Sequence, residues 1–243
     1  MHSGSYFMNK ERAIAAIRRE LEAVTAERRA AQNDPAAYVS RIALRSFQSQ
    51  RMARTHADLL NNAESRKAAE FFLNDLYGTE DLAKRDADLE RVVPAMERVL
   101  PGTALKTVAE AIALDALSEK LDAAMAQRLG QSFSEEEYVA AYREAGTRTE
   151  RERQIAHVES VGNALCELVR IPLIGSTLAM MRGPAKLAGL AELQSFLERG
   201  FKAFKAMKNP DLFVATIVQR ERAIMDRLYA GVVDPFSLGP TGD

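Results

Sequence analysis

The stretch from Ala104 to Leu129, ALKTVAEAIALDALSEKLDAAMAQRL, decides the fold class. It is rich in alanine and leucine, and it contains no glycine or proline until Gly130 follows directly. Such a composition favours a long helix, and glycine is the residue that most often ends one. Apolar residues at three- and four-residue spacing recur along the rest of the chain, as in Asn9–Ala31. We find no credible strand, so the sequence predicts an all-α protein.

Turn signals divide the chain into about nine or ten helices. Asp34-Pro35 combines a capping residue with proline at the first helical position, and Ser134 with Glu137 forms a capping box. Asn61-Asn62 is expected to end the second helix, and Gly183-Pro184 to separate two later ones. Loops of two to six residues favour antiparallel neighbours, so we expect a compact multi-helix bundle.

One domain is expected to span residues 8–231, with a possible hinge at residues 130–134. Residues 1–7 resemble an expression remnant ahead of a natural start at Met8. Residues 232–243 are rich in proline and glycine and are expected to form a loose tail. Gly162 lies on the apolar seam of its helix, which predicts the close approach of a neighbouring helix.

Composition narrows the range of functions. The chain has 243 residues, with 33 basic against 34 acidic side chains and a net charge of −1. General nucleic-acid binding needs a basic excess, which is absent. The single cysteine, Cys166, excludes an internal disulfide and fits a reducing compartment. We see no secretory signal, and the longest low-charge stretch, residues 171–181, is too short to span a bilayer. The expected location is therefore the cytoplasm.

Two stretches resemble a family of uncharacterised bacterial helical proteins, a domain of unknown function. The first is FFLNDLYG at residues 71–78 followed by KRDADL at residues 84–89, an FFLxDLYG…RDxDL pattern. The second is GLAELQSFLERGF at residues 189–201. The resemblance implies a bacterial, soluble, all-helical protein. It transfers no activity, cofactor or catalytic residue.

The histidines are the residues that could ligate a metal ion or haem. His56 lies on an apolar stripe between Met52 and Leu59 and could ligate haem iron, although a buried, hydrogen-bonded role is commoner for such a histidine. The residues three before His56 and His157 are Ala53 and Gln154, so the Glu-x-x-His pairs of di-iron bundles are absent. No cysteine and histidine cluster has zinc spacing. We therefore assign no metal ligand and no catalytic residue.

The densest polar region lies in and after the second helix. We interpret it as a structural ion-pair network, with a polar ligand pocket as the alternative; its members are Arg51, Arg54, Asp58, Asp75, Arg85, Asp86 and Asp88. Tyr77 could add its hydroxyl to either arrangement. Gln194 lies on an apolar stripe, where a buried amide must find partners. It marks either an interhelical hydrogen bond or a ligand contact.

Two functions remain open from the sequence. The first is a non-catalytic cytoplasmic protein that acts through protein–protein contacts, as a homodimer. The second is a protein or enzyme that binds haem, a lipid-like molecule or another apolar ligand in a pocket lined by His56, Asp75, Tyr77 and Gln194. The Met180-Met181-Arg182 corner with Leu173, Ile174 and Leu178 could form an apolar docking surface, although core packing is the commoner role of such residues.

Overall fold

The computed structural model describes residues 3–76, 88, 90–94, 96–97 and 102–238, and the side chains of these from residue 10 onward except those of residues 75 and 76. The described residues contain helices and no strand, which confirms the all-α prediction. The helices are α1 Ser3–Asn33, α2 Pro35–Thr55, α3 Ala57–Asn61, α4 Arg66–Phe71, the π-helical turn η1 Phe72–Leu76, α6 Gly102–Leu129, α7 Glu135–Glu144, α8 Arg148–Leu168, α9 Ile174–Leu187, α10 Ala191–Lys205 and α11 Pro210–Ala230.

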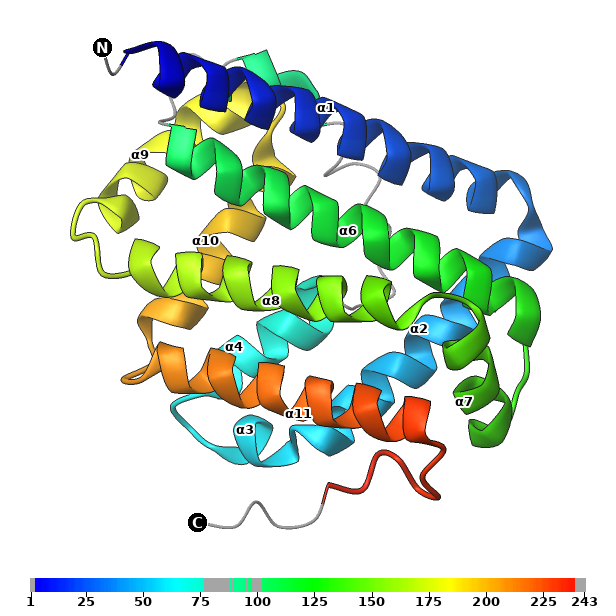
Figure 1. Ribbon diagram of the computed structural model, residues 1–243. Coiled ribbons are helices and arrows are strands. Elements are labelled where there is room, and N and C mark those ends of the chain that lie inside the picture. Colours follow the sequence, from blue (N-terminus) through cyan, green and yellow to red (C-terminus); the bar gives the residue numbers. More distant parts are fainter. Residues whose placement is uncertain (1–2, 77–87, 89, 95, 98–101, 239–243) are drawn as a thin grey trace.

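Four long helices lie side by side in the order α1, α6, α8 and α11 (Figure 1). α8 runs opposite to α6 and α11, whereas α1 and α6 run in the same direction. α2 crosses behind this layer and contacts α1 and α6. α10 contacts α4, α8 and α9. The compact bundle expected from the sequence is therefore confirmed.

Three apolar clusters hold the bundle together, and the smallest of them joins α2, α6 and α7 through Leu44, Met125 and Tyr138. The first joins α1 to α6 through buried residues that include Ile14, Ile17, Leu21, Val24, Leu105 and Ile112. The second joins α4, α8, α10 and α11 through Phe71, Cys166, Phe204, Phe213 and Ile217, among others. A methyl group added at Gly162 would lie 2.7 Å from Val214 Cγ1, which confirms the close approach of α8 and α11.

Several expected helix ends are confirmed. Asp34 caps α2 by accepting from the backbone N–H groups of Ala36 and Ala37. Ser134 and Glu137 form the predicted capping box of α7. Gly130 follows α6 with a φ of +66°. Local sequence thus sets these boundaries, because each capping side chain satisfies N–H groups that have no partner inside the helix.

Two expected boundaries are wrong. α2 ends at Thr55 rather than near Asn61, because His56 leaves the helical conformation and its backbone N–H bonds to Met52 and Arg54 carbonyls. α9 continues through Pro184 and ends at Leu187 instead of breaking at Gly183-Pro184. The break lies at Gly189, whose φ of +70° lets the chain turn, and Leu190 N–H donates to the Ala185 carbonyl. Glycine adopts this left-handed conformation without a steric cost.

The segment that was expected to be a loose tail lies partly against the body. Pro235 is buried, and Arg227 donates to the carbonyls of Asp234 and Pro235. The Phe236 ring packs near the rings of Phe47 and Tyr138. Among the described residues, none of the helices is both long enough and apolar enough to cross a membrane.

Candidate functional site

The sequence candidates His56 and Arg51 meet on a partner from the other end of the chain. Arg51 donates from Nη1 to both carboxylate oxygens of Glu221 on α11, at 2.6 and 2.7 Å. His56 Nε2 lies 3.0 Å from Glu221 Oε1. Both side chains are buried. The nitrogen that would face a haem iron or a metal is thus already engaged by a carboxylate.

Glu221 is held ionised in this position. Burial raises the pKa of the Glu221 carboxyl, but the charge of Arg51 and the hydrogen bond with His56 outweigh it and lower that pKa to about 2. Arg51 Nε and His56 Nδ1 are buried without a hydrogen-bond partner among the described residues. The contacts of Arg51 and His56 with Glu221 link the C-terminal end of α2 to α11, so these side chains help to hold the two helices together.

The other members of the predicted network that the structure describes lie in separate places. Asp58 accepts two hydrogen bonds from Arg220, at 2.6 and 2.8 Å, and these bonds lower the pKa of its carboxyl. The buried Asp88 pairs with Arg91, three residues further along. Arg54 is exposed. Arg85, Asp86 and Tyr77, together with the side chain of Asp75, lie outside the described residues.

Gln194 makes an interhelical hydrogen bond. Its side-chain amide on α10 donates to the Leu178 carbonyl of α9 at 2.6 Å and to Glu198 Oε1 at 3.1 Å. Glu198 also accepts from Arg182 of α9, at 2.6 and 2.5 Å, and the bonds from Arg182 and Gln194 lower the pKa of its carboxyl to about 2. These contacts fasten α9 to α10.

Sequence reasoning missed the most buried carboxylate network. Glu119 on α6 is 2% exposed and accepts from Arg28 Nε at 3.0 Å, from Arg41 and from Arg45. Burial raises the pKa of Glu119, but the three guanidinium charges reverse this and lower it. A signal did exist, because Glu119 falls on the same face of α6 as Leu105, Ile112 and Ala116, a buried stripe.

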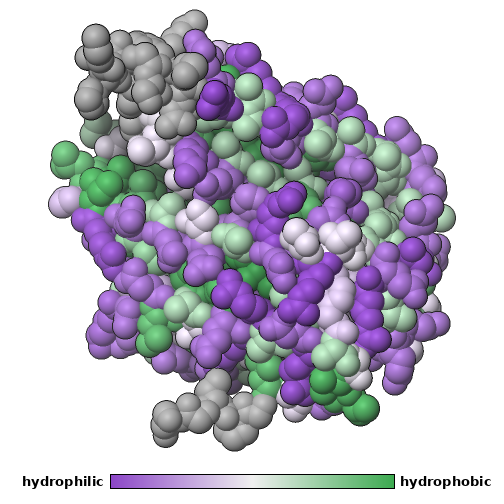
Figure 2. All heavy atoms as spheres, in the orientation of Figure 1, coloured by the Kyte–Doolittle hydropathy of each residue, from purple (hydrophilic) through white to green (hydrophobic). Residues whose placement is uncertain are grey.

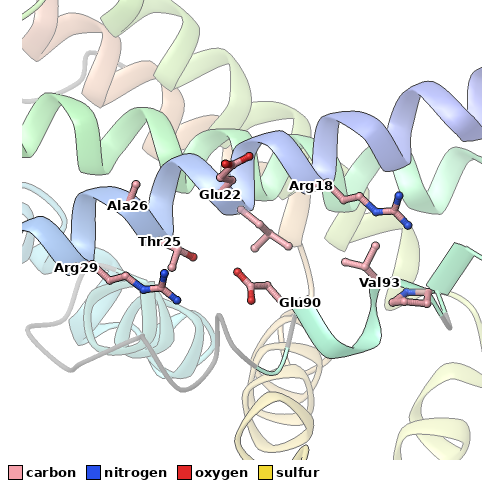
Figure 3. Close-up of a pocket in the computed structure, with 9 residues that line it drawn as sticks. Arg18, Glu22, Thr25, Ala26, Arg29, Glu90 and Val93 are labelled. Atoms are coloured by element: carbon pink, nitrogen blue, oxygen red, sulfur yellow. The ribbon is translucent and has the colours of Figure 1, made fainter.

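The structure contains a surface groove of about 430 Å³ between α1 and the helical residues 90–94 (Figure 3). Its apolar floor includes the buried residues Leu21 and Val93, and its charged rim consists of the exposed side chains Arg18, Glu22, Arg29 and Glu90. The groove is large enough for a small ligand. Of the sequence candidates whose side chains the structure describes, neither His56 nor Gln194 lines it.

No group of three histidine, cysteine or acidic side chains that could hold a metal ion occurs within the described part of the chain. Cys166 is buried, and burial raises the pKa of its thiol. A protonated thiol is a poor nucleophile and a poor metal ligand. Neither metal chemistry nor cysteine chemistry is favoured by the groups described here.

The most unusual surface is α9. Leu173, Met180 and Leu187 follow one another at seven-residue spacing and are 73%, 76% and 91% exposed. Ile171 and Met181 are also exposed, and these five residues are called the α9 surface below. Figure 2 shows hydrophobic residues gathered at the left edge of the molecule, where the turn from α8 enters α9. Of the six residues proposed as a docking surface or core, Ile174 and Leu178 are half-buried and the other four are exposed.

Among the described helices, α10 is the main neighbour of α9. Ala185 is its one buried residue, and Gly175 lets α10 come close, since an added methyl group would lie 3.0 Å from the Phe201 ring. α9 carries two charged residues, Arg182 and Lys186, and no acidic residue. A helix this apolar is ordinarily buried on more than one side, so its free face is a candidate interaction site.

The described residues thus form an all-α bundle in which one apolar helix is exposed. The chain belongs to the family described as "Domain of unknown function (DUF8198)", whose model matches residues 27–235. The predicted membership of a family of unknown function is thereby confirmed. No curated protein and no solved structure matches the chain.

Proposed function

We propose that this protein is a non-catalytic binding protein that acts through protein–protein contacts made by the α9 surface. The observation that carries this proposal is the exposure of Leu173, Met180 and Leu187 on one face of a helix. Leaving such a side chain in water forgoes roughly 1.5–3 kcal/mol relative to burying it. Three such residues at seven-residue spacing lie on the same face of the helix, which scattered surface leucines do not.

The charges around the surface support a protein partner rather than a nucleic acid. Arg182 is neutralised by Glu198, so Lys186 is the one cation of α9 without an acidic partner among the described residues. Nucleic acids require several cations on one face. The proposed location is the cytoplasm, which fits a buried, unpaired cysteine.

The small-ligand alternative rests on the groove beside α1. Its rim residues are exposed, so a bound molecule would keep much of its surface in water, whereas ligand sites bury most of their ligand. Haem binding through His56 would require His56 to give up its contact with Glu221. The α9 surface offers contact area without any such rearrangement.

Site-specific photo-crosslinking tests the proposal. A photoreactive phenylalanine analogue placed at Met180 in the full chain should form protein adducts when expressing cells are irradiated. The matched control is the same analogue at Leu212, which is also exposed but lies on α11. Adducts at position 180 and few at position 212 are the expected result. Equal yields at the two positions, or no protein adduct at 180, would reject the proposal.

A further inference from the structure

The stripe on α9 is symmetric about its central residue, and this symmetry points to a specific partner. Leu173 and Leu187 each lie seven residues from Met180, about 10 Å along the helix at a rise of about 1.5 Å per residue. In a two-fold interface, the residue on the axis meets its own copy and the others exchange. A helix laid antiparallel across α9 would therefore place leucine on leucine and methionine on methionine.

We propose that the α9 surface binds a second copy of this chain, with the two α9 helices antiparallel and Met180 on the two-fold axis. This inference rests on the proposed function and names its partner. Leu173 then packs against Leu187 of the second copy, at both ends of the contact.

The area of the surface fits a dimer. At about 200 Å² for a fully exposed leucine or methionine, Leu173, Met180 and Leu187 together expose on the order of 500 Å². A specific interface of standard size buries roughly 800 Å² on each partner. The stripe, covered by its own copy, therefore supplies more than half of what a stable pair requires.

The residues between the large side chains permit close contact. Ser176 and Gly183 each lie three residues after a large one, and both are small and exposed. The hydroxyl groups of Ser176 and Thr177 both donate to the Leu173 carbonyl, at 2.9 Å each. Their polar atoms are satisfied within the helix, so covering them with an apolar partner leaves no donor unpaired.

The charges decide between the two possible directions. Arg182 is bound to Glu198 of α10, so Lys186 is the charge that matters here. In a parallel pair the two Lys186 ammonium groups would lie at the same height along the contact, and like charges brought close together are unfavourable. In the antiparallel pair Lys186 lies level with Ile174 of the second copy, and the two Lys186 groups lie at opposite ends of the contact. The α9 face carries no acidic residue that would favour the parallel direction.

Light scattering after size exclusion tests the pairing on the purified full chain. The wild type should have twice the mass of one chain, and Met180→Asp should raise the dimer dissociation constant by at least roughly 100-fold. Leu212→Asp is the matched control and should leave the dimer intact. Circular dichroism should show all three proteins equally helical. A monomeric wild type, or a dimer that Met180→Asp leaves unchanged, would overturn the inference.

Engineered cysteines test the direction. Under mild oxidation Met180→Cys should form a disulfide with its own copy, whereas Leu173→Cys alone and Leu187→Cys alone should not. A mixture of Leu173→Cys and Leu187→Cys chains should form the mixed disulfide. Cys166 is buried and does not interfere. Self-crosslinking of Leu173→Cys that exceeds that of Met180→Cys would overturn the antiparallel register.

The two proposals fail in different ways. Photo-adducts at position 180 whose partners are other proteins, together with a monomeric purified chain, would keep the protein-contact function and reject self-pairing. A monomeric chain that forms no adduct and binds vesicles of anionic lipid through α9 would reject both.

Discussion

α2 and α9 distribute their residues in opposite ways. α2 turns charged side chains inward, so that Arg41 and Arg51 are buried against carboxylates of α6 and α11. α9 turns large apolar side chains outward, and Leu187 is 91% exposed. Both helices pack on the bundle and contain few acidic residues. Hydrophobicity alone therefore does not decide which face of a helix is buried in this protein.

This comparison separates side chains that stabilise the fold from side chains that are exposed and could contact a partner. The guanidinium groups around Glu119 need partners, because an isolated buried charge costs several kcal/mol, and each partner constrains how α1, α2 and α6 meet. No such constraint applies to the exposed residues of α9. Their contribution to folding is small, so their presence calls for an explanation outside the folded monomer.

The largest effect is expected from Glu119→Gln. The substitution leaves Arg28, Arg41 and Arg45 without their central carboxylate, and breaking a buried ion pair in this way costs about 3–5 kcal/mol. Urea unfolding followed by circular dichroism measures the loss. The control Glu144→Gln removes an exposed ion pair with Arg128 and should cost under about 1 kcal/mol. Equal losses of stability in the two variants would mean that the buried cluster around Glu119 stabilises the fold no more than an exposed ion pair does.

The contribution of the Arg51–Glu221 ion pair should appear in the pH dependence of the free energy of unfolding. The pKa of Glu221 falls from an ordinary 4.5 to about 2 on folding, so the unfolded chain binds more protons between these values. The stabilisation is present above about pH 4.5 and disappears as the pH falls towards 2, a loss of roughly 3 kcal/mol. Glu221→Gln should lack this part of the acid response in unfolding curves measured from pH 6 to 2. Parallel curves for the two proteins would contradict it.

The helices were predictable because their signals are local. Apolar spacing, the capping box of Ser134 and the proline after Asp34 all act within one or two turns of the chain. The end of α2 was not predictable in this way. It depends on His56 lying next to Glu221, which is 165 residues away in the sequence.

Closeness in sequence also did not identify the partners of the described members of the charged network. Arg51 and Asp58 were grouped because they are close in sequence, but their partners Glu221 and Arg220 come from α11. Neighbours in sequence on one helix point to different sides, so proximity along the chain does not select ion pairs. The residues of α9 were recognised as a surface or a core, and the sequence could not decide between them. That choice depends on whether a second helix covers α9.

A smaller effect is expected from Gln194→Ala, which tests how α9 is attached. The amide of Gln194 bonds to the Leu178 carbonyl at 2.6 Å, and such a bond contributes about 1 kcal/mol. Hydrogen exchange should become faster in α9 while α6 keeps its protection, since α9 packs mainly on α10. Ser195→Ala on the exposed side of α10 is the control and should leave α9 unchanged. Uniformly faster exchange would show that α9 is part of the main cooperative unit.

The smallest effect should come from Met180→Ala. Met180 is 76% exposed, whereas Met125 is fully buried beside Leu44 and Tyr138. At a protein concentration low enough to keep the chain monomeric, Met180→Ala should change the free energy of unfolding by under about 0.5 kcal/mol, and Met125→Ala should lower it by about 2–5 kcal/mol. Methionine would then contribute strongly to the free energy of unfolding at position 125 and very little at position 180. If Met180→Ala cost as much as Met125→Ala, the α9 surface would be part of the folded monomer's own stability and would need no partner to explain it.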